Sequence, residues 1–94
     1  MTLESLLENG AQIVDVRTPM EFQMGNVEGS VNIPLNEVPT RLDEIKAIEG
    51  PILLCCQSGA RSGQATAYLS NEGVECYNAG SWLDVNRYVA SKAS

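Results

Sequence analysis

The segment PILLCCQSGAR, residues 51–61, decides the fold of this chain. Its first half is an apolar run that suits a buried β-strand and is far too short to cross a bilayer. Its second half is small and polar, and the apolar positions beyond it, Ala65, Tyr68 and Leu69, share one face of a helix that ends at Gly73. A buried strand followed by a polar loop and a helix indicates a parallel α/β sheet.

The rest of the chain alternates between strand and helix in the same way. Further strands are predicted at residues 11–16, 29–34 and 74–77, and helices after Thr2, at 21–24, from Pro39 to Gly50 and from Ser81 onward. Strands separated by helices imply right-handed crossovers and a parallel sheet covered on both faces. We therefore expect one α/β domain over residues 1–94, built as a three-layer sandwich.

The composition and charge exclude several classes of protein. Hydrophobic residues make up 44% of the 94 residues and charged residues 19%, which is typical of a folded domain and argues against disorder. The net charge of −6 makes nucleic acids and anionic membranes poor partners. The chain opens with Met1-Thr2-Leu3-Glu4, where a signal peptide needs basic residues, so we expect a cytoplasmic protein.

Cysteine and histidine usage narrows the chemistry further. The three cysteines are an odd number without a CxxC spacing, so neither a disulfide framework nor a structural zinc site is indicated, and a reducing compartment fits best. The chain contains no histidine, which removes Ser-His-Asp and Cys-His catalysis and most transition-metal sites. We expect neither a metal nor a cofactor.

Cys56 is the candidate reactive group. It is the last residue of its predicted strand, at the mouth of the loop, and ligands of parallel sheets bind outside the carboxyl ends of strands. Small loop residues can turn their N–H groups inward as a nest for an anion, while the next helix adds its positive N-terminal end and Arg61 a full positive charge. These features should lower the pKa of the thiol without any histidine. This interpretation would be contradicted if the Cys56 thiol were fully enclosed by the protein, or if the N–H groups of the loop pointed away from it.

The alternative for Cys56 is a buried structural cysteine, which is the common fate of a thiol in an apolar strand. Its position before a loop of small polar residues that ends in an arginine favours the reactive role. Cys55 differs, because the period of two along a strand turns it to the opposite face. Cys76 lies inside another predicted strand. We interpret Cys55 and Cys76 as packing residues.

Four segments of the chain carry a family resemblance. They are CQSGARS at residues 56–62, IVDVRTPMEF at 13–22, GNVEGSVNIP at 25–34 and NAGSW at 78–82. In their order along the chain they resemble the rhodanese homology domain, whose active-site loop opens with a cysteine in a C-x4-R segment. The likeness covers nearly the whole chain.

The resemblance implies a five-stranded parallel sheet and a sulfurtransferase that carries sulfane sulfur as a persulfide on Cys56. The donor would be a small anion such as thiosulfate or a protein persulfide, the acceptor a thiol or cyanide, and the protein a monomer. The residues expected to hold the persulfide are Gln57, Ser58, Gly59, Ala60, Arg61 and Ser62. Arg61 either binds a substrate sulfonate or braces the loop. Ser58 and Ser62 donate to the sulfur, cap the next helix, or do both.

Four places outside the loop bear on the fold more than on chemistry. Asn26 stands where the family usually has histidine, and we interpret it as structural. The first family strand is either reduced to Met1-Thr2 or missing, so the sheet is expected to have four or five strands. Arg17 is expected to pair with Glu21 or another nearby acid, and Asp15 to hydrogen-bond the backbone.

Three other functions remain open. A cysteine phosphatase or arsenate reductase also holds an anion on a Cys-to-Arg loop, but the family pattern there has five residues between the two, and here four separate Cys56 from Arg61. A non-catalytic binding module with this fold would generally lack the cysteine. A carrier that passes sulfur between proteins would show the same residues as a thiosulfate-using enzyme.

Overall fold

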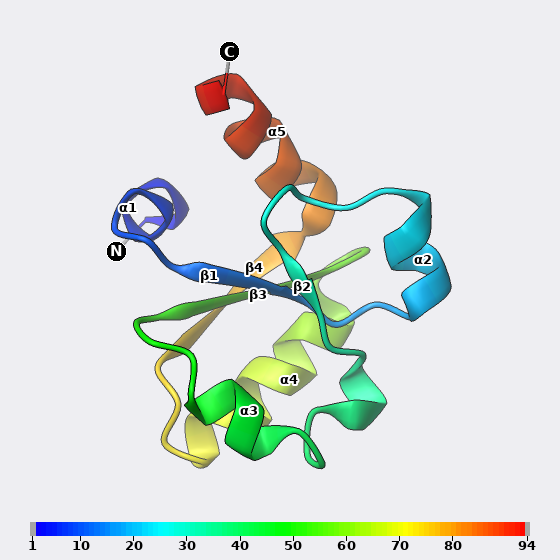
Figure 1. Cartoon of the computed structure of the whole chain (residues 1–94), viewed down its shortest axis with the longest axis vertical. Coiled ribbons are helices and arrows are strands. Elements are labelled where there is room, and N and C mark those ends of the chain that lie inside the picture. The colour runs from blue at the N-terminus through cyan, green and yellow to red at the C-terminus, as the bar shows by residue number, and fades with distance from the viewer. Residues whose placement is uncertain (1, 94) are drawn as a thin grey trace.

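A parallel β-sheet forms the centre of the molecule (Figure 1). The computed structural model describes residues 2–93, and over that range the strands are β1 Gln12–Asp15, β2 Val31–Asn32, β3 Ile52–Cys56 and β4 Cys76–Ser81, in the order β2-β1-β3-β4. The predicted α/β class with a parallel sheet is confirmed. Strand β4 starts later and runs further than the predicted stretch 74–77, because its pairing with β3 continues past a register shift as far as Ser81.

Helices connect the strands and begin at recognisable caps. Over residues 2–93 they are α1 Leu3–Glu8, α2 Pro19–Met24, α3 Leu42–Lys46, α4 Ala60–Asn71 and α5 Trp82–Ala93, with a short 3-10 helix, η1, at Leu35–Glu37. Thr2 caps α1 as predicted, and Thr18 caps α2. Helix α3 begins after Pro39, at Leu42, because the chain first makes η1, whose Glu37 carbonyl accepts the N–H of Arg41.

The helices cover both faces of the sheet and enclose two apolar clusters. One cluster lies under α3 and α4 and includes Val14, Val16, Ile45, Ile52, Leu54, Cys56, Ala65 and Leu69 (Figure 1). The other lies under α1 and α5 and consists of Leu6, Ile13, Val27, Leu53, Cys55 and Val85. Cys55 and Cys56 therefore face opposite sides of the sheet, as the period of two predicts.

The carboxyl ends of β1 and β3 meet at one edge, and this places the candidate site. Asp15, the last residue of β1, is paired in register with Cys55, so Cys56 extends one residue beyond that pair. Helix α2 follows β1 and buries none of its own residues. Among residues 2–93 no strand precedes β1, since Thr2 already caps α1; the sheet has four strands. No helix in this range is long and apolar enough to cross a membrane.

Candidate functional site

The sulfur of Cys56 is surrounded by hydrogen-bond donors from the loop that follows it. The Gly59 N–H donates to Sγ at 3.0 Å and the Ser62 N–H at 3.4 Å, and the Ser62 hydroxyl oxygen lies 3.4 Å from the same atom. Gly59 has a φ of 102°, in the left-handed region that favours glycine, and this turn brings its N–H back toward the strand. The loop amides therefore face inward, as the small residues of the loop predict.

Cys56 takes the place of a capping side chain for α4. This helix has Gly59 at its N-cap and no side-chain cap, so its first amides need other acceptors. Ser62 occupies the N3 position, whose amide a capping side chain normally accepts, and its N–H points at Sγ instead. The capping role that was the alternative for Ser58 and Ser62 is therefore wrong.

The balance between burial and hydrogen bonding sets the acidity of Cys56. Burial acts to raise the pKa of the thiol, because it penalises the charged form. The hydroxyl and amide of Ser62 and the amides of Gly59 and Ser58 act in the opposite direction, and together they hold the pKa of Cys56 below its ordinary value. The loop thus favours a thiolate with no histidine present.

The thiol is enclosed by the loop. Cys56 has no exposed surface, whereas Gln57 and Ser58 directly after it are exposed and Gly59 is half-buried. The expectation of a thiol open at the loop mouth is wrong for this form of the loop, because the chain folds back over the sulfur to bring its amides into hydrogen-bonding distance. Because Gln57 and Ser58 are the exposed residues beside the sulfur, we expect a reagent to reach Sγ when these two residues move.

The guanidinium of Arg61 is held by Glu21 on α2. Its two terminal nitrogens donate to the two carboxylate oxygens at 2.7 and 3.0 Å. Hydrogen bonds from Arg61 first, and then from Thr18, lower the pKa of Glu21 to about 2. This geometry supports the bracing role of Arg61, since the ion pair joins the start of α4 to α2 and would have to open before the guanidinium met a substrate sulfonate.

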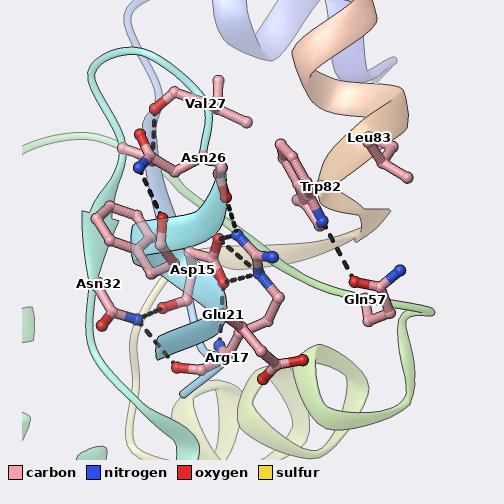
Figure 2. A network of polar contacts seen from close by, with 12 residues as sticks. Asp15, Arg17, Glu21, Asn26, Val27, Asn32, Gln57, Trp82 and Leu83 are labelled. Atoms are coloured by element: carbon pink, nitrogen blue, oxygen red, sulfur yellow. Dashed lines mark hydrogen bonds and ion pairs between the residues drawn. The ribbon is translucent and has the colours of Figure 1, made fainter. Parts of the chain in front are cut away.

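A second ion pair, which is buried, lies at the end of β1 (Figure 2). The Arg17 Nε and Nη2 donate to the Asp15 carboxylate at 2.8 to 3.0 Å, and Nη2 also donates to the Gly25 carbonyl at 2.7 Å. Arg17 therefore pairs with the nearby acid Asp15. Glu21, the other partner considered for it, is taken by Arg61.

Trp82, at the start of α5, links this ion pair to the sulfur loop. Its ring centroid lies 4.4 Å from the guanidinium carbon of Arg17, and its Nε1 donates to Oε1 of Gln57 at 3.4 Å (Figure 2). A Cβ added at Gly25 would lie 3.0 Å from the Trp82 ring, so a larger residue there would have to displace the ring. Trp82 therefore anchors the start of α5 against Arg17 and Gly25.

Asn78 on β4 completes the surroundings of the loop. Its Nδ2 donates to the Gly59 carbonyl at 3.1 Å, and its Oδ1 accepts from the Gly80 N–H at 3.0 Å and from the Ser62 hydroxyl at 2.7 Å. Sequence reasoning missed this residue, although the NAGSW segment contains it. The family resemblance places that segment before the last helix and assigns no contacts to Asn78. Its contacts with Gly59 and Ser62 follow from the pairing of β4 with β3, which the sequence does not show.

Asn26, at the position of the family histidine, bonds to α2. Its Nδ2 donates to the Phe22 carbonyl at 2.8 Å, and its side chain is exposed (Figure 2). The Gly25 N–H donates to the same carbonyl at 3.3 Å, so the Asn26 side chain adds a second donor at the end of the helix. This contact fits the structural role expected of Asn26.

The other two cysteines pack in the interior. Cys55 has no exposed surface, and burial, followed by the nearby Asp15 carboxylate, raises its pKa to about 12. The Cys76 sulfur lies 3.5 Å from the Ser70 hydroxyl and 3.6 Å from the Thr66 carbonyl. Within the described residues, no three His, Cys, Asp or Glu side chains are placed to hold a metal ion.

Comparison with known proteins identifies related chains. A family model described as a rhodanese-like domain matches residues 2–86. The uncharacterised protein YqhL of Bacillus subtilis is 44% identical over 69 residues, which are 72% of this chain and 54% of that protein. Thiosulfate sulfurtransferase GlpE of Pseudomonas aeruginosa is 37% identical over 73 residues, 76% of this chain and 64% of the relative. The chain thus spans between about half and two thirds of these relatives.

A solved structure gives the same result for the fold. The structure described as a rhodanese with anions from E. coli aligns with a TM-score of 0.71 and 35% identity, over 80% of this chain and 91% of that one. The predicted three-layer arrangement with a parallel sheet is therefore shared with a solved member of the family named by the resemblance.

Proposed function

This chain belongs to the rhodanese-like domain family, and we propose that it is a sulfurtransferase that carries sulfane sulfur as a persulfide on Cys56. The observation that carries the proposal is the convergence of the Gly59 and Ser62 amides on a strand-end thiol whose pKa is lowered. The reaction class is supported by relatives, since GlpE of Pseudomonas aeruginosa is named a thiosulfate sulfurtransferase.

The proposed reaction has two displacement steps at sulfur. The Cys56 thiolate attacks the outer sulfur of thiosulfate, a new S–S bond forms, the original S–S bond breaks, and sulfite leaves with its electron pair. Cyanide or a thiolate then attacks the outer sulfur of the persulfide, takes that sulfur, and returns Cys56 as a thiolate. The negative charge stays on sulfur at both stages, and the inward amides of the loop stabilise it there.

Access to Cys56 requires the loop to open at the end that begins with Gln57, directly after the cysteine. Gln57 is tied to Trp82 by a bond of 3.4 Å, which is weak, whereas Arg61 is tied to Glu21 by two short charge-assisted bonds. We therefore expect Gln57 and Ser58 to move while Arg61 stays in place, and Gly59 stays bonded to Asn78 and Gly63. In this scheme the ion pair braces the loop between turnovers.

The donor can be thiosulfate or a persulfide on another protein, because both expose an outer sulfur joined to a leaving group. With a protein persulfide the leaving group is that protein's thiolate, and the acceptor is again a thiol or cyanide. All three cysteines are free, which fits a reducing compartment such as the cytoplasm. A monomer suffices for the scheme, since the donors around Cys56 come from one chain.

The phosphatase alternative has less support. Four residues separate Cys56 from Arg61, and the Arg61 guanidinium is occupied by Glu21. Arg17 is likewise engaged by Asp15. A phosphate dianion arriving at the loop would therefore meet two guanidinium groups whose charge is already balanced by carboxylates.

Intact mass after incubation with thiosulfate tests the proposed function. We expect one added sulfur, which cyanide then removes as thiocyanate. Cys56→Ala should take up none, while Cys76→Ala, the matched control on β4, should take up as much as the unaltered chain. Uptake of sulfur by Cys56→Ala, or hydrolysis of an aryl phosphate that depends on Cys56, would overturn the proposal.

A further inference from the structure

The Ser62 hydroxyl lies between two groups that can accept its proton. Its oxygen is 2.7 Å from Asn78 Oδ1 and 3.4 Å from Cys56 Sγ. Ser62 has no exposed surface, so water does not replace either partner. A hydroxyl has one proton to donate, and it can satisfy only one of these two acceptors at a time.

Asn78 is held in the orientation in which its Oδ1 accepts the hydrogen bond from the Ser62 hydroxyl. Its Nδ2 donates to the Gly59 carbonyl at 3.1 Å, and its Oδ1 accepts from the Gly80 N–H at 3.0 Å. Exchanging the two ends of the amide would set donor against donor at Gly80 and acceptor against acceptor at Gly59. Oδ1 therefore faces Ser62, and the hydroxyl that donates to it offers its own oxygen to the Cys56 S–H.

We propose that Asn78 is a positioning residue that controls where the Ser62 hydroxyl points and thereby how acidic Cys56 is. In the thiol form the chain of bonds runs from the Cys56 S–H to the Ser62 oxygen and from the Ser62 O–H to Asn78. A thiolate has no proton to donate, so the hydroxyl must turn from Asn78 to the sulfur when Cys56 ionises. Asn78 Oδ1 thus competes with the sulfur and favours the thiol, against the amides of Gly59 and Ser62. The proposal rests on the proposed function only in taking Cys56 as the reacting group.

The charged groups around the loop do not change when Asn78 and the sulfur compete for the Ser62 proton. The titratable groups that adjoin the loop or its direct partners are Asp15, Arg17, Glu21, Cys55 and Arg61. The four charged ones form two closed ion pairs, and Cys55 is uncharged at neutral pH because its pKa is about 12. On β4 and α5, Cys76, Tyr77, Asp84 and Arg87 bond to other partners than Cys56, Ser62 or Asn78. None of these residues bonds to Asn78, so substitutions at Asn78 leave the local charge as it is unless they add one.

The pH titration of the Cys56 thiolate in Asn78→Ala and Asn78→Asp tests the proposal. It is followed by ultraviolet thiolate absorbance, with the signal of Cys56→Ala subtracted. In Asn78→Ala the hydroxyl is released to the sulfur, so the midpoint should fall and the thiolate fraction below it should rise about 2- to 10-fold. The Gly59 carbonyl keeps the Gly63 N–H at 2.9 Å, which holds the loop. Asn78→Asp keeps an acceptor and adds a negative charge, so the midpoint should rise. Both variants lose the donor to Gly59, so midpoints that move in the same direction would overturn the proposal.

The same Asn78→Ala substitution, made in a chain that also carries Ser62→Ala, distinguishes control of the Ser62 hydroxyl from a purely structural role. Ser62→Ala should raise the midpoint by itself, and Asn78→Ala should no longer lower it when the hydroxyl is absent. If Asn78→Ala shifts the midpoint equally with and without the hydroxyl, the residue acts through Gly59 and the proposal is wrong. The titration needs no sulfur donor, so its outcome is independent of whether Cys56 proves to carry a persulfide.

Discussion

Cys55 and Cys56 are neighbours on one strand with the same side chain and the same lack of exposed surface, yet their acidities move in opposite directions. Cys55 lies on the face covered by α1 and α5, beside the Asp15 carboxylate, and its pKa rises to about 12. Cys56 lies on the other face at the strand end, where the loop amides point at its sulfur, and its pKa falls. Burial alone therefore does not decide the state of a thiol.

What separates the two thiols is the supply of hydrogen-bond donors. A central position in a parallel strand has its backbone amides engaged in the sheet, so Cys55 gains no donor to offset burial. The last position of the strand is followed by helix amides that have no internal acceptors, and Cys56 accepts them. The same geometry that caps α4 also stabilises a sulfur anion.

The largest expected difference between the two thiols is in alkylation. The pKa of Cys55 is raised to about 12 and that of Cys56 is held below its ordinary value, so at neutral pH far more of Cys56 than of Cys55 is thiolate. We expect Cys56 to react at least about 10-fold faster, although the more acidic thiolate is the weaker nucleophile. Brief iodoacetamide treatment followed by peptide mapping should therefore label Cys56 well before Cys55. In the unfolded chain the two should react alike, which provides the control. Equal labelling in the folded chain would mean that the loop does not activate Cys56.

A smaller difference is expected when Cys55 is replaced. Cys55→Ala removes a sulfur from an enclosed apolar cluster and should lower the free energy of unfolding by about 1–2 kcal/mol. Urea unfolding measures this, and sulfur uptake from thiosulfate should persist in the folded variant. If Cys55→Ala keeps its stability but no longer takes up sulfur, then Cys55 and not Cys56 carries the sulfur, and our assignment is wrong.

The smallest expected effect comes from the ion pair that braces the loop. Glu21→Gln should cost about 1 kcal/mol of stability at neutral pH, since the pair is about one-third exposed and is screened. Glu21 has a folded pKa of about 2 against 4.5, so its contribution is complete above about pH 4.5 and disappears as pH falls toward 2.

Urea unfolding over that acidic range measures the contribution of Glu21. The unaltered chain should lose free energy of unfolding as the pH falls from about 4.5 toward 2, and Glu21→Gln should lose less over the same range. Glu44→Gln serves as the matched control, because Glu44 pairs with Arg41 far from the sulfur loop. An acid response that both variants alter equally would show that the Glu21–Arg61 pair contributes nothing special to the loop.

From the sequence alone one can predict the elements that follow local patterns. The apolar run at 52–56, the small polar loop and the helix that ends near Gly73 are all present, because each depends on residues a few positions apart. The placement of Cys55 and Cys56 on opposite faces follows from the strand period in the same way. The inward amides after Cys56 also follow, since Gly59 allows the turn that makes them.

Only the tertiary structure decided which distant groups meet at the sulfur loop. Glu21 reaches Arg61 across 40 positions, and Asn78 reaches Ser62 across 16. Several acids and amides in the chain could have made such contacts, and no local pattern chooses among them, because the choice depends on strand order and helix packing. The enclosure of Cys56 is likewise a property of how the loop folds back, which short-range periodicity does not encode.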